Sequence, residues 1–328
     1  MSSSVHIVIV NWNTRDYLRE CLESIGRSRL DGVELARVSV IDNDSSDGSA
    51  DGLEAIAPLP LEVVRNRHNA GFAAACNQGA ARSTADYLLF LNPDTRLAED
   101  TLATVVRFMD SREAADVGIC GARVVDETGA PANSVARFPT LRIVLGKITG
   151  LHRVAPRLFP GHRVPAVELD RSGTVDQVIG AFFLIRRELF ERLGGFDRRY
   201  FVYYEEVDLA LRARRLGARS YFLYEATVMH VENVSSSQVP ALRLYHSQRS
   251  RLLFALAHWP RSHALALLVL TFTAEPLARL VKAALDRDPA AASQSVGASR
   301  LLASELLRRR RGFGKDGDRV ARTPARAK

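Results

Sequence analysis

The 328-residue sequence is poor in cysteine and shows no leader segment. Its three cysteines, Cys21, Cys76 and Cys120, are far apart and match neither a zinc-ligand spacing nor a disulfide framework. We interpret them as small core residues in a reducing compartment. The N-terminus passes from Met-Ser-Ser-Ser directly into an apolar run, without a basic region or a cleavage site. No signal peptide is therefore predicted, and we expect a cytoplasmic protein.

The loops that follow the predicted strands lack glycine-rich phosphate-binding motifs. This absence argues against a dinucleotide dehydrogenase and against a P-loop NTPase. The formal charge of +8 is concentrated at one end, because residues 300–328 contain ten Lys/Arg and only three Asp/Glu. A nucleic-acid enzyme would carry its positive charge around the active cleft, so no nucleic-acid partner is expected.

Hydrophobic residues make up 47% and charged residues 25% of the chain, so it can bury a full core. Short apolar runs predict strands over 5–10, 38–41, 61–64, 87–91, 117–125, 178–185 and 218–224. Apolar residues at helical spacing predict helices after residue 17, over 100–110, over 186–193 and after residue 204. This alternation predicts an α/β fold with a mostly parallel sheet flanked by helices.

The stretch from Asp86 to Thr95 organises the prediction. Its apolar run over residues 87–91 is typical of a strand buried on both faces, and the run stops at Asn92-Pro93-Asp94. Proline has no N–H for the ladder, so Asp94 stands at the carboxyl end of the strand, where open α/β sheets bind ligands. A carboxylate and an amide there suit a divalent cation that also holds a diphosphate. An ordinary turn is the alternative.

Other acidic groups follow predicted strands or begin a predicted helix. Asp42 starts a polar loop, and we expect it beside Asp94 at the same sheet edge. Glu205, Glu206 and Asp208 begin a helix, where a favourable interaction with the helix dipole is the alternative explanation. His230 follows a predicted strand, and a structural role is its alternative. Residues 139–176 are weakly patterned and are predicted to form a long surface excursion near an acceptor site.

Together these segments resemble the inverting family 2 glycosyltransferases with the glycosyltransferase A fold, most closely their bacterial rhamnosyltransferase-like branch. The resemblance runs from about residue 5 to about residue 234. It rests on Val10-Asn11-Trp12-Asn13, Asp42-Asn43-Asp44-Ser45-Ser46-Asp47-Gly48-Ser49, Asn69-Ala70-Gly71-Phe72-Ala73, Phe90-Leu91-Asn92-Pro93-Asp94, Gly194-Gly195-Phe196-Asp197 and Tyr204-Glu205-Glu206-Val207-Asp208-Leu209.

The resemblance implies a role for each matched position. Binding of the nucleotide sugar would fall to Asn11, Asn13, Asp42, Asn43, Asp44, Asn69, Gly71 and Asn92. Asp94, with His230, would hold Mg²⁺ or Mn²⁺ against the diphosphate. Asn92-Pro93-Asp94 stands where the commoner family motif is Asp-x-Asp, so one charge is missing.

The resemblance also implies the catalytic and acceptor residues. Glu206 would be the general base, supported by Glu205 and Asp208, although the usual family motif is Glu-Asp. Which of the two glutamates is the base stays open at this point. The acceptor would contact Gly180, Phe182 and Tyr204.

The implied activity is inverting transfer of a sugar, with L-rhamnose expected, from a nucleoside diphosphate. The donor would be dTDP-rhamnose or a UDP-sugar, and the acceptor a hydroxyl of a cell-surface glycan or of a polyprenyl-linked sugar. Two alternatives are a nucleotidyltransferase, which would normally show a glycine-rich basic N-terminal loop, and a catalytically inactive carbohydrate-binding relative.

The sequence is predicted to form a catalytic domain followed by two C-terminal segments. Residues 1–240 would form the catalytic domain, residues 241–290 a helical extension and residues 291–328 a basic, disordered tail. The uncharged core over residues 264–274 is shorter than the ~20 residues of a spanning helix. We expect either helices lying on the inner membrane face, helped by the basic tail, or an ordinary helical subdomain.

Overall fold

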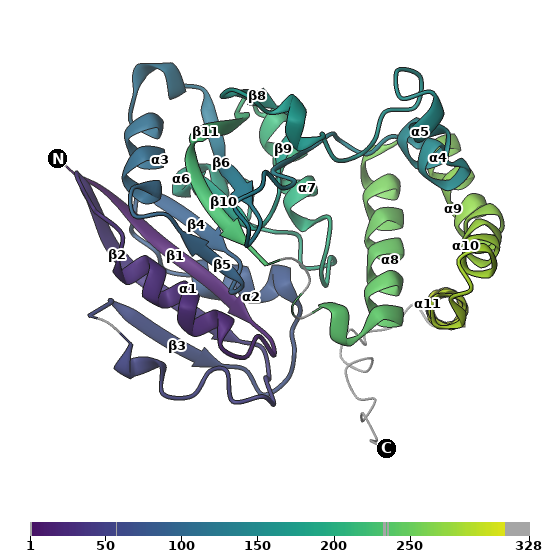
Figure 1. The fold of residues 1–328 in the computed structure, drawn as a ribbon, viewed down its shortest axis with the longest axis horizontal. Coiled ribbons are helices and arrows are strands. Elements are labelled where there is room, and N and C mark those ends of the chain that lie inside the picture. Colours follow the sequence, from purple (N-terminus) through teal and green to yellow (C-terminus); the bar gives the residue numbers. More distant parts are fainter. Residues whose placement is uncertain (1, 57, 232–233, 235, 312–328) are drawn as a thin grey trace.

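The structure is a computed structural model that describes residues 2–56, 58–231, 234 and 236–311. A sheet-containing body and a lobe of helices lie side by side (Figure 1). The strands are β1 Ser3–Asn11, β2 Val33–Asp42, β3 Leu61–Arg65, β4 Tyr87–Leu91, β5 Thr95–Leu97, β6 Val117–Val125, β7 Val135–Ala136, β8 Gly173–Val175, β9 Gln177–Val178, β10 Phe182–Arg186 and β11 Arg219–His230. The helices are α1 Tyr17–Gly26, α2 Phe72–Ala80, α3 Thr101–Met109, α4 Leu141–Thr149, α5 Leu151–Val154, α6 Arg187–Arg192, α7 Glu205–Arg215, α8 Pro240–His258, α9 Arg261–Phe272, α10 Ala274–Leu285 and α11 Pro289–Arg311.

The main sheet has the strand order β3-β2-β1-β4-β10-β6-β11-β5, with β8 paired to β11. Its first four strands are parallel, as predicted, whereas β10 is antiparallel to both of its neighbours. Strand β11 is parallel to β6 but antiparallel to β5 and β8. The predicted α/β fold is confirmed, and its second half is a mixed rather than a parallel sheet.

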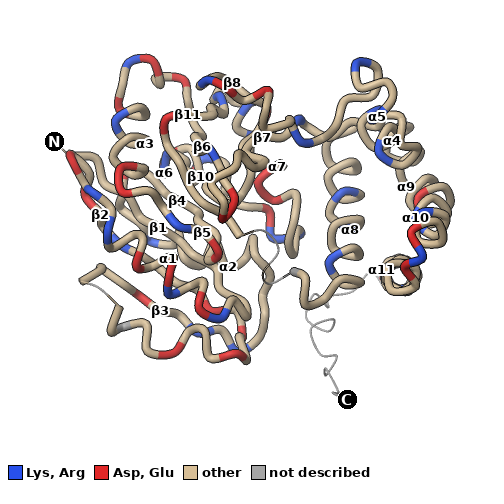
Figure 2. The backbone as a smooth tube through the Cα atoms, viewed as in Figure 1, with Lys and Arg blue, Asp and Glu red and all other residues tan. Residues whose placement is uncertain are grey.

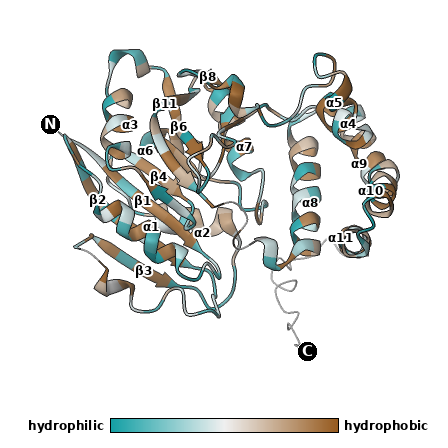
Figure 3. Ribbon diagram, in the orientation of Figure 1, coloured by the Kyte–Doolittle hydropathy of each residue, from teal (hydrophilic) through white to brown (hydrophobic). Residues whose placement is uncertain are grey.

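Both faces of the central strands are buried. In β1, Ile7 and Ile9 face a core shared with α1 and α3, whereas Val8 and Val10 face a second core shared with α2 and α7. Alternate side chains of a strand point to opposite faces, so one apolar run supplies both cores. Figure 3 shows this as hydrophobic colouring along the central strands.

The register brings the carboxyl ends of the parallel strands to one edge. Asn11, the last residue of β1, pairs with Asp42, the last residue of β2. On the other side of β1, Ile9 pairs with Leu91, the last residue of β4. The loops that begin at residues 12, 43 and 92 therefore leave the sheet side by side.

The strand predicted over 178–185 is two strands. Strand β9 pairs with β7 in a separate two-stranded sheet, and β10 joins the main sheet. Between them the backbone N–H of Ile179 donates to Ser134, and the carbonyl of Ala181 accepts from Asn92. The strand is interrupted because the backbone of β9 pairs with β7, whereas the backbone of β10 pairs with β4. Strand β11 is also longer than predicted, so His230 is its last residue.

The prediction of a structureless surface excursion over residues 139–176 is wrong. This segment contains α4, α5 and β8. Helix α4 begins after Thr140, whose hydroxyl oxygen accepts from the backbone N–H of Ile143 at 3.3 Å. Val144 is buried against Tyr245 and Leu252 of α8. We define α4, α5 and α8–α11 as the helical lobe. Helix α4 is stable because its apolar side chains pack against other helices of this lobe.

The helical lobe also includes part of the predicted disordered tail. Residues 291–311 belong to α11, which packs against α8 and α10, with Ala298 and Leu302 buried. The expectation of disorder is wrong there because an i, i+4 pair of apolar residues gives the helix a face to bury. Residues 312–328, the rest of that tail, lie outside the described residues. The predicted domain bounds stay a prediction.

Helices α9 and α10 together are more apolar than the sequence reading indicated. The segment Arg261–Leu285 has 25 residues and a mean hydropathy of 1.7 over its most apolar part, so it is long and apolar enough to cross a membrane. Of that apolar part, 22% is buried inside the structure. The backbone is irregular between the helices, at Thr273, with φ −121° and ψ −81°. The expectation that this segment is too short to span is therefore wrong by length, because it counted only the uncharged core. A buried core helix would meet the same criterion.

Candidate active site

The ends of β1 and β2 are tied together by one amide. Nδ2 of Asn11 donates to Oδ1 of Asp42 at 2.8 Å and to the hydroxyl oxygens of Ser45 at 3.1 Å and Ser49 at 2.9 Å. Oδ1 of Asn11 accepts from the hydroxyl of Thr14 at 2.5 Å. Asn11 is 0% and Asp42 4% exposed. The structure thus brings these two predicted residues together and fixes both in place.

The serines of this network were quoted in the motif but not predicted as site residues. Ser45 and Ser49 follow Asp42 by three and seven residues, and this spacing in the polar loop could have indicated them. Predicted Asn13, at φ 52°, accepts from the backbone N–H of Ser46 at 2.8 Å and so pins the same loop. Predicted Asp44, at φ 68°, is exposed and lies at the outer turn of the loop.

Asn43, Asn69 and Gly71 shape the backbone near the site. Oδ1 of Asn43 accepts from Asn66 at 2.9 Å, and its Nδ2 donates to the carbonyl of Gly71 at 3.3 Å. Oδ1 of Asn69 accepts from the backbone N–H of Gly71 at 2.9 Å. A Cβ on Gly71 would lie 2.6 Å from the carbonyl oxygen of Phe201. With φ at 86°, only glycine allows this loop to touch the segment that leads into α7.

The end of β4 meets the end of β11. Oδ1 of Asp94 lies 3.2 Å from Nε2 of His230, and Nδ2 of Asn92 lies 3.4 Å from the same ring nitrogen. The backbone N–H of Val231 donates to the carbonyl of Asp94 at 3.0 Å. Asp94 is 9% exposed. The predicted metal pair, Asp94 and His230, is therefore in direct contact beside Asn92.

This pair fits a divalent cation only in part. A carboxylate oxygen and an imidazole nitrogen facing each other are two donors of kinds that Mn²⁺ accepts. Within the described ranges, no group of three or more His, Cys, Asp and Glu side chains could hold a metal ion. Any cation here would need oxygen ligands from another molecule, which a diphosphate supplies.

The start of α7 holds the two glutamates. Tyr203 and Tyr204 precede them at φ 67° and 71°, in the left-handed region, so the chain turns sharply before the helix. Glu205 is 5% exposed and Glu206 is half-buried. The Oε2 atoms of both are buried with no hydrogen-bond partner in the described part of the chain.

Burial decides the protonation of these glutamates. Desolvation and the neighbouring Glu206 raise the pKa of Glu205 well above its usual range. Desolvation also raises the pKa of Glu206, against hydrogen bonds from backbone N–H groups at the helix start that favour its charged form. The two carboxyls therefore titrate as a pair.

The predicted acceptor residues divide into two groups. A Cβ on Gly180 would lie 3.9 Å from Cγ of Glu206, so Gly180 faces the glutamate. The ring of Tyr204 lies between His162, at 6.4 Å, and Phe254, at 5.6 Å. Phe182 is 1% exposed and packs in the core on the α1 side of the sheet. Its side chain does not face Glu206, because β10 alternates its side chains and turns this one inward.

Contacts across the sheet connect Glu206 to the end of β4. Gly180 faces Glu206, and the carbonyl of the next residue, Ala181, accepts from the backbone N–H of Asn92 at 3.0 Å. Asn92 is in turn 3.4 Å from His230, the partner of Asp94. The glutamate and the metal pair therefore flank one edge of the sheet.

Asp208 supports α7 rather than facing the site. Its two oxygens contact Nε of Arg212 at 2.7 Å and Nε2 of His258 at 2.6 Å. Arg212 also donates to the carbonyls of Leu193 and Gly195. Asp208 therefore holds α7 in place: it contacts His258 of α8 directly, and through Arg212 it is connected to the turn that follows α6. No sequence pattern indicated His258, which lies 50 residues after Asp208.

Comparison with known proteins agrees with this geometry. The family model described as glycosyl transferase family 2 matches residues 6–194. The rhamnosyltransferase WbbL of Escherichia coli K12 is 29% identical over 232 residues, covering 69% of this chain and 83% of that protein. The N-acetylglucosaminyl-diphospho-decaprenol L-rhamnosyltransferase of Mycobacterium tuberculosis is 25% identical over 272 residues, covering 77% and 84%.

Solved structures with the same fold support the assignment. The mannosyltransferase PcManGT from Pyrobaculum calidifontis, in complex with GDP-Man and Mn²⁺, superposes with a TM-score of 0.53 at 21% identity, covering 93% of this chain and 80% of that one. GalNAc-T7 with UDP, GalNAc and Mn²⁺ superposes with a TM-score of 0.54 at 17% identity, covering 77% and 50%. On the match of its family model, which spans more than half of its length, this chain belongs to glycosyl transferase family 2.

Proposed function

We propose that this glycosyltransferase moves L-rhamnose from a nucleoside diphosphate to a hydroxyl of a polyprenyl-linked or cell-surface glycan, with inversion at the anomeric carbon. The observation that carries the chemical part is the pair of carboxyls of Glu205 and Glu206, each with one buried oxygen that has no partner among the described residues, beside the edge that bears Asp94. A carboxyl with a raised pKa in a partly enclosed site suits proton transfer.

The donor would occupy the edge formed by the ends of β1, β2 and β4. Asp42 keeps Oδ2 available beside the polar loop, where it accepts only a long bond, 3.4 Å, from the backbone N–H of Ser45. We assign it to the base of the nucleotide. Asp94 and His230 would hold Mg²⁺ or Mn²⁺ on the diphosphate, and when bound the cation supplies charge neutralisation for the leaving group. The Mn²⁺ in related structures supports a divalent ion without setting its identity.

We assign the general base to Glu206. Its side chain is half-buried and faces Gly180, whereas Glu205 is almost fully buried. Burial raises the pKa of both carboxyls, so the pair shares one proton and one negative charge, and we assign the charge to the less buried Glu206.

The proposed step is a single displacement. Glu206 takes the proton from the acceptor hydroxyl, and the oxygen forms its bond to the anomeric carbon. The bond from that carbon to the diphosphate oxygen breaks on the opposite face, and its electron pair leaves with the nucleoside diphosphate. Asn11 and Asn92 hold the donor edge in place through their bonds to Asp42 and Ala181.

The sugar and the acceptor are taken from the relatives. Both curated relatives are rhamnosyltransferases, and one name specifies a diphospho-decaprenol carrier. Identity of 25–29% supports the class of sugar and acceptor as a proposal for this chain. Placement of the enzyme at the inner membrane face stays a prediction.

A donor screen tests the proposal. We would measure nucleoside diphosphate release and glycan product with dTDP-rhamnose, UDP-galactofuranose, UDP-glucose and UDP-N-acetylglucosamine, each with Mn²⁺ and a polyprenyl diphosphate N-acetylglucosamine acceptor. The expected result is acceptor-dependent release with dTDP-rhamnose above the other donors. Preference for a UDP-sugar would overturn the rhamnose assignment, and release without acceptor-dependent product would overturn transfer.

A further inference from the structure

A cluster of positively charged side chains lies where α4, α8 and α10 meet in the helical lobe. The charged neighbours of Lys147 on α4 are Arg251 on α8, Arg279 on α10, Arg163 and one carboxylate, Glu275. Helix α4 packs against α10, so these side chains come from three elements of one folded lobe. The cluster is separate from the residues assigned to the donor.

Glu275, the carboxylate beside Lys147 among the described residues, is already shared by two arginines. Arg279 donates to Oε1 of Glu275 at 3.0 Å, and Arg251 donates to Oε2 of the same carboxylate. Arg251 is 8% exposed, and its Nε is buried with no partner in the described part of the chain. Two guanidinium groups on one carboxylate leave an excess positive charge. Figure 2 shows acidic and basic positions next to each other on α10.

Lys147 adds a cation that has no acidic partner among the described residues. Its side chain is exposed, whereas Lys282, the other lysine in the described ranges, forms an ion pair with Asp286. Desolvation and the like charges of Arg251 and Arg279 lower the pKa of Lys147. Several cations held together in this way attract an anion, because the anion offsets their mutual repulsion.

The cluster lies on the glutamate side of the active site. The imidazole of His162 is stacked on the ring of Tyr204, with centroids 6.4 Å apart and planes 7° apart. Burial and the nearby Lys147 and Arg163 lower the pKa of His162 to about 4, so the ring is neutral. Tyr204 immediately precedes Glu205. Two aromatic residues therefore separate the cations from the start of α7.

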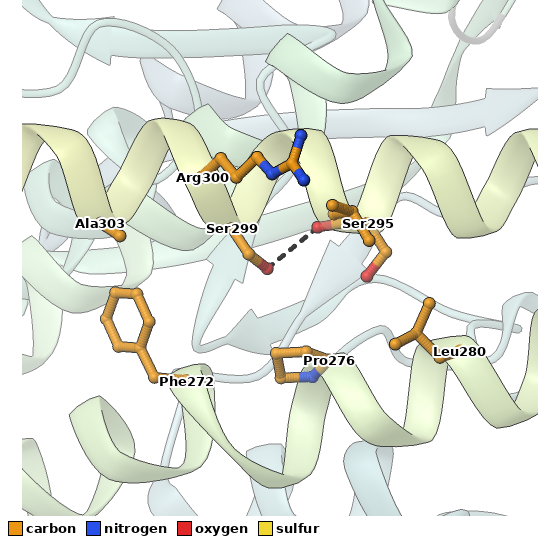
Figure 4. Close-up of a pocket in the computed structure, with 8 residues that line it drawn as sticks. Phe272, Pro276, Leu280, Ser295, Ser299, Arg300 and Ala303 are labelled. Atoms are coloured by element: carbon orange, nitrogen blue, oxygen red, sulfur yellow. Dashed lines mark hydrogen bonds between the residues drawn. The ribbon is translucent and has the colours of Figure 1, made fainter.

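Helix α10 also carries apolar side chains, on faces other than the one that bears Arg279 and Glu275. Leu277, Val281 and Leu285 are 63%, 50% and 78% exposed and recur every four residues, so they form one exposed stripe. On the side toward α11 there is a groove of about 300 Å³, where Phe272 at the end of α9 and Pro276 and Leu280 of α10 face α11 (Figure 4). The rim of this groove carries Arg300. The exposed stripe and the cation Arg279 therefore lie on opposite faces of α10.

We propose that Lys147 and Arg279 bind the diphosphate of a lipid-linked acceptor. The sugar of that acceptor then extends past His162 and Tyr204 toward Glu206. The diphosphate offsets the excess positive charge of Lys147, Arg251 and Arg279 over Glu275. This inference rests on the proposed lipid-linked acceptor and assigns its binding site.

Vesicle binding by the full chain tests the site without requiring turnover. The probes are phosphatidylcholine vesicles that contain undecaprenyl diphosphate, vesicles that contain phosphatidylglycerol at the same total charge, and neutral vesicles. We expect sedimentation with the diphosphate vesicles above both others, and competition by inorganic pyrophosphate. Lys147→Gln should weaken this binding about fivefold, as expected for one partly exposed charge-assisted contact. Lys282→Gln is the matched control and should leave it unchanged.

Equal binding by Lys147→Gln and Lys282→Gln would overturn the site. Equal binding of phosphatidylglycerol vesicles, weakened equally by Lys147→Gln, would overturn its preference for a diphosphate. Arg279→Gln, checked for a native melting temperature, gives a second test, and Lys147→Arg should restore binding.

A kinetic measurement separates this inference from the proposed function. Lys147→Gln should raise KM for the diphosphate-linked acceptor about fivefold, by the same lost contact, and leave KM for an uncharged alkyl glycoside of the same sugar unchanged. Equal effects on both acceptors would contradict a diphosphate site. Loss of transfer in the unmodified enzyme with every donor would refute the function and leave the vesicle result standing.

Discussion

The two sides of the active site treat their polar groups in opposite ways. At the strand ends, Asn11 uses both of its side-chain atoms within one network that fixes Asp42 and the following loop. At the start of α7, Glu205 and Glu206 each keep a buried oxygen without a partner. On the first side the polar groups are fixed by hydrogen bonds, which suits the proposed donor site. On the second side the pKa of each glutamate is raised, which suits the proposed proton transfer.

This difference separates binding from chemistry. A satisfied network resists change of shape and of charge, so it suits a nucleotide that must be held in one position. A desolvated carboxyl pair is costly in the folded state, and its raised pKa makes it a better proton acceptor. Substitutions at the strand ends should therefore lower stability and donor binding, whereas substitutions at the start of α7 should lower kcat.

The largest expected effect follows from Glu206→Gln. The amide keeps the size of the side chain but cannot accept the acceptor proton, so kcat should fall about 10³-fold. Donor KM should stay the same, because the hydrogen bonds of Asn11 and Asp42 at the proposed donor site are not changed. The matched control is Glu205→Gln, for which we expect a much smaller loss; the reverse order would move the base to Glu205. Initial rates of nucleoside diphosphate release measure both.

The next effect follows from Asp94→Asn. Loss of the carboxylate that faces His230 should lower kcat on the order of 10²-fold, because the leaving diphosphate loses its electrostatic stabilisation. The rate should also need far more Mn²⁺ to reach its maximum. Asp100→Asn, at an exposed acid before α3, is the control. An unchanged Mn²⁺ dependence in Asp94→Asn would remove this residue from the cation site.

On the rigid side, Asn11→Ala should cost stability as well as donor binding. It leaves Oδ1 of Asp42 buried without its 2.8 Å partner, so the free energy of unfolding should drop by about 1–3 kcal/mol. Urea denaturation measures the change. Exposed Asp44→Asn, which tolerates the φ of 68° at that position, should leave stability nearly unaltered, and a similar loss in both variants would show that Asn11 is not specifically fixed.

The smallest effect is a gain of stability in Glu205→Gln. The folded protein holds the Glu205 proton more tightly than the unfolded chain, so the wild-type stability falls as pH rises above the unfolded pKa of about 4.3. The amide has no proton to lose, so the stability gap between variant and wild type should widen with pH until the folded carboxyl titrates. Melting temperatures from pH 4 to pH 8 test the sign, and a shrinking gap would contradict it.

The sequence predicted the strand-end residues well, because each motif is contiguous and follows an apolar strand. Asn11, Asp42 and Asn92 could be placed at one edge from the alternation of strands and helices alone. The partners Thr14, Ser45 and Ser49 depend on how the loop folds back on Asn11, which spacing does not determine.

The helical lobe and its contacts could not be predicted in the same way. The pairing of Asp208 with His258 joins α7 to α8, and neither residue signals the other along the chain. Helix α4 depends on burial of Val144 against Tyr245 and Leu252, a tertiary contact that a weak local pattern does not reveal. The resemblance implied Phe182 as an acceptor residue, but the alternation of side chains along β10 turns it into the core.

We propose that an activated sugar binds at the edge of the sheet flanked by Asp94 and Glu206. A crystal of the protein grown with dTDP and Mn²⁺, measured for anomalous scattering from manganese, tests it most directly. The account predicts a manganese peak at Asp94 and His230, bridged to a diphosphate whose terminal phosphate faces Glu206. A nucleotide bound away from Glu206, or manganese bound away from Asp94, would contradict it.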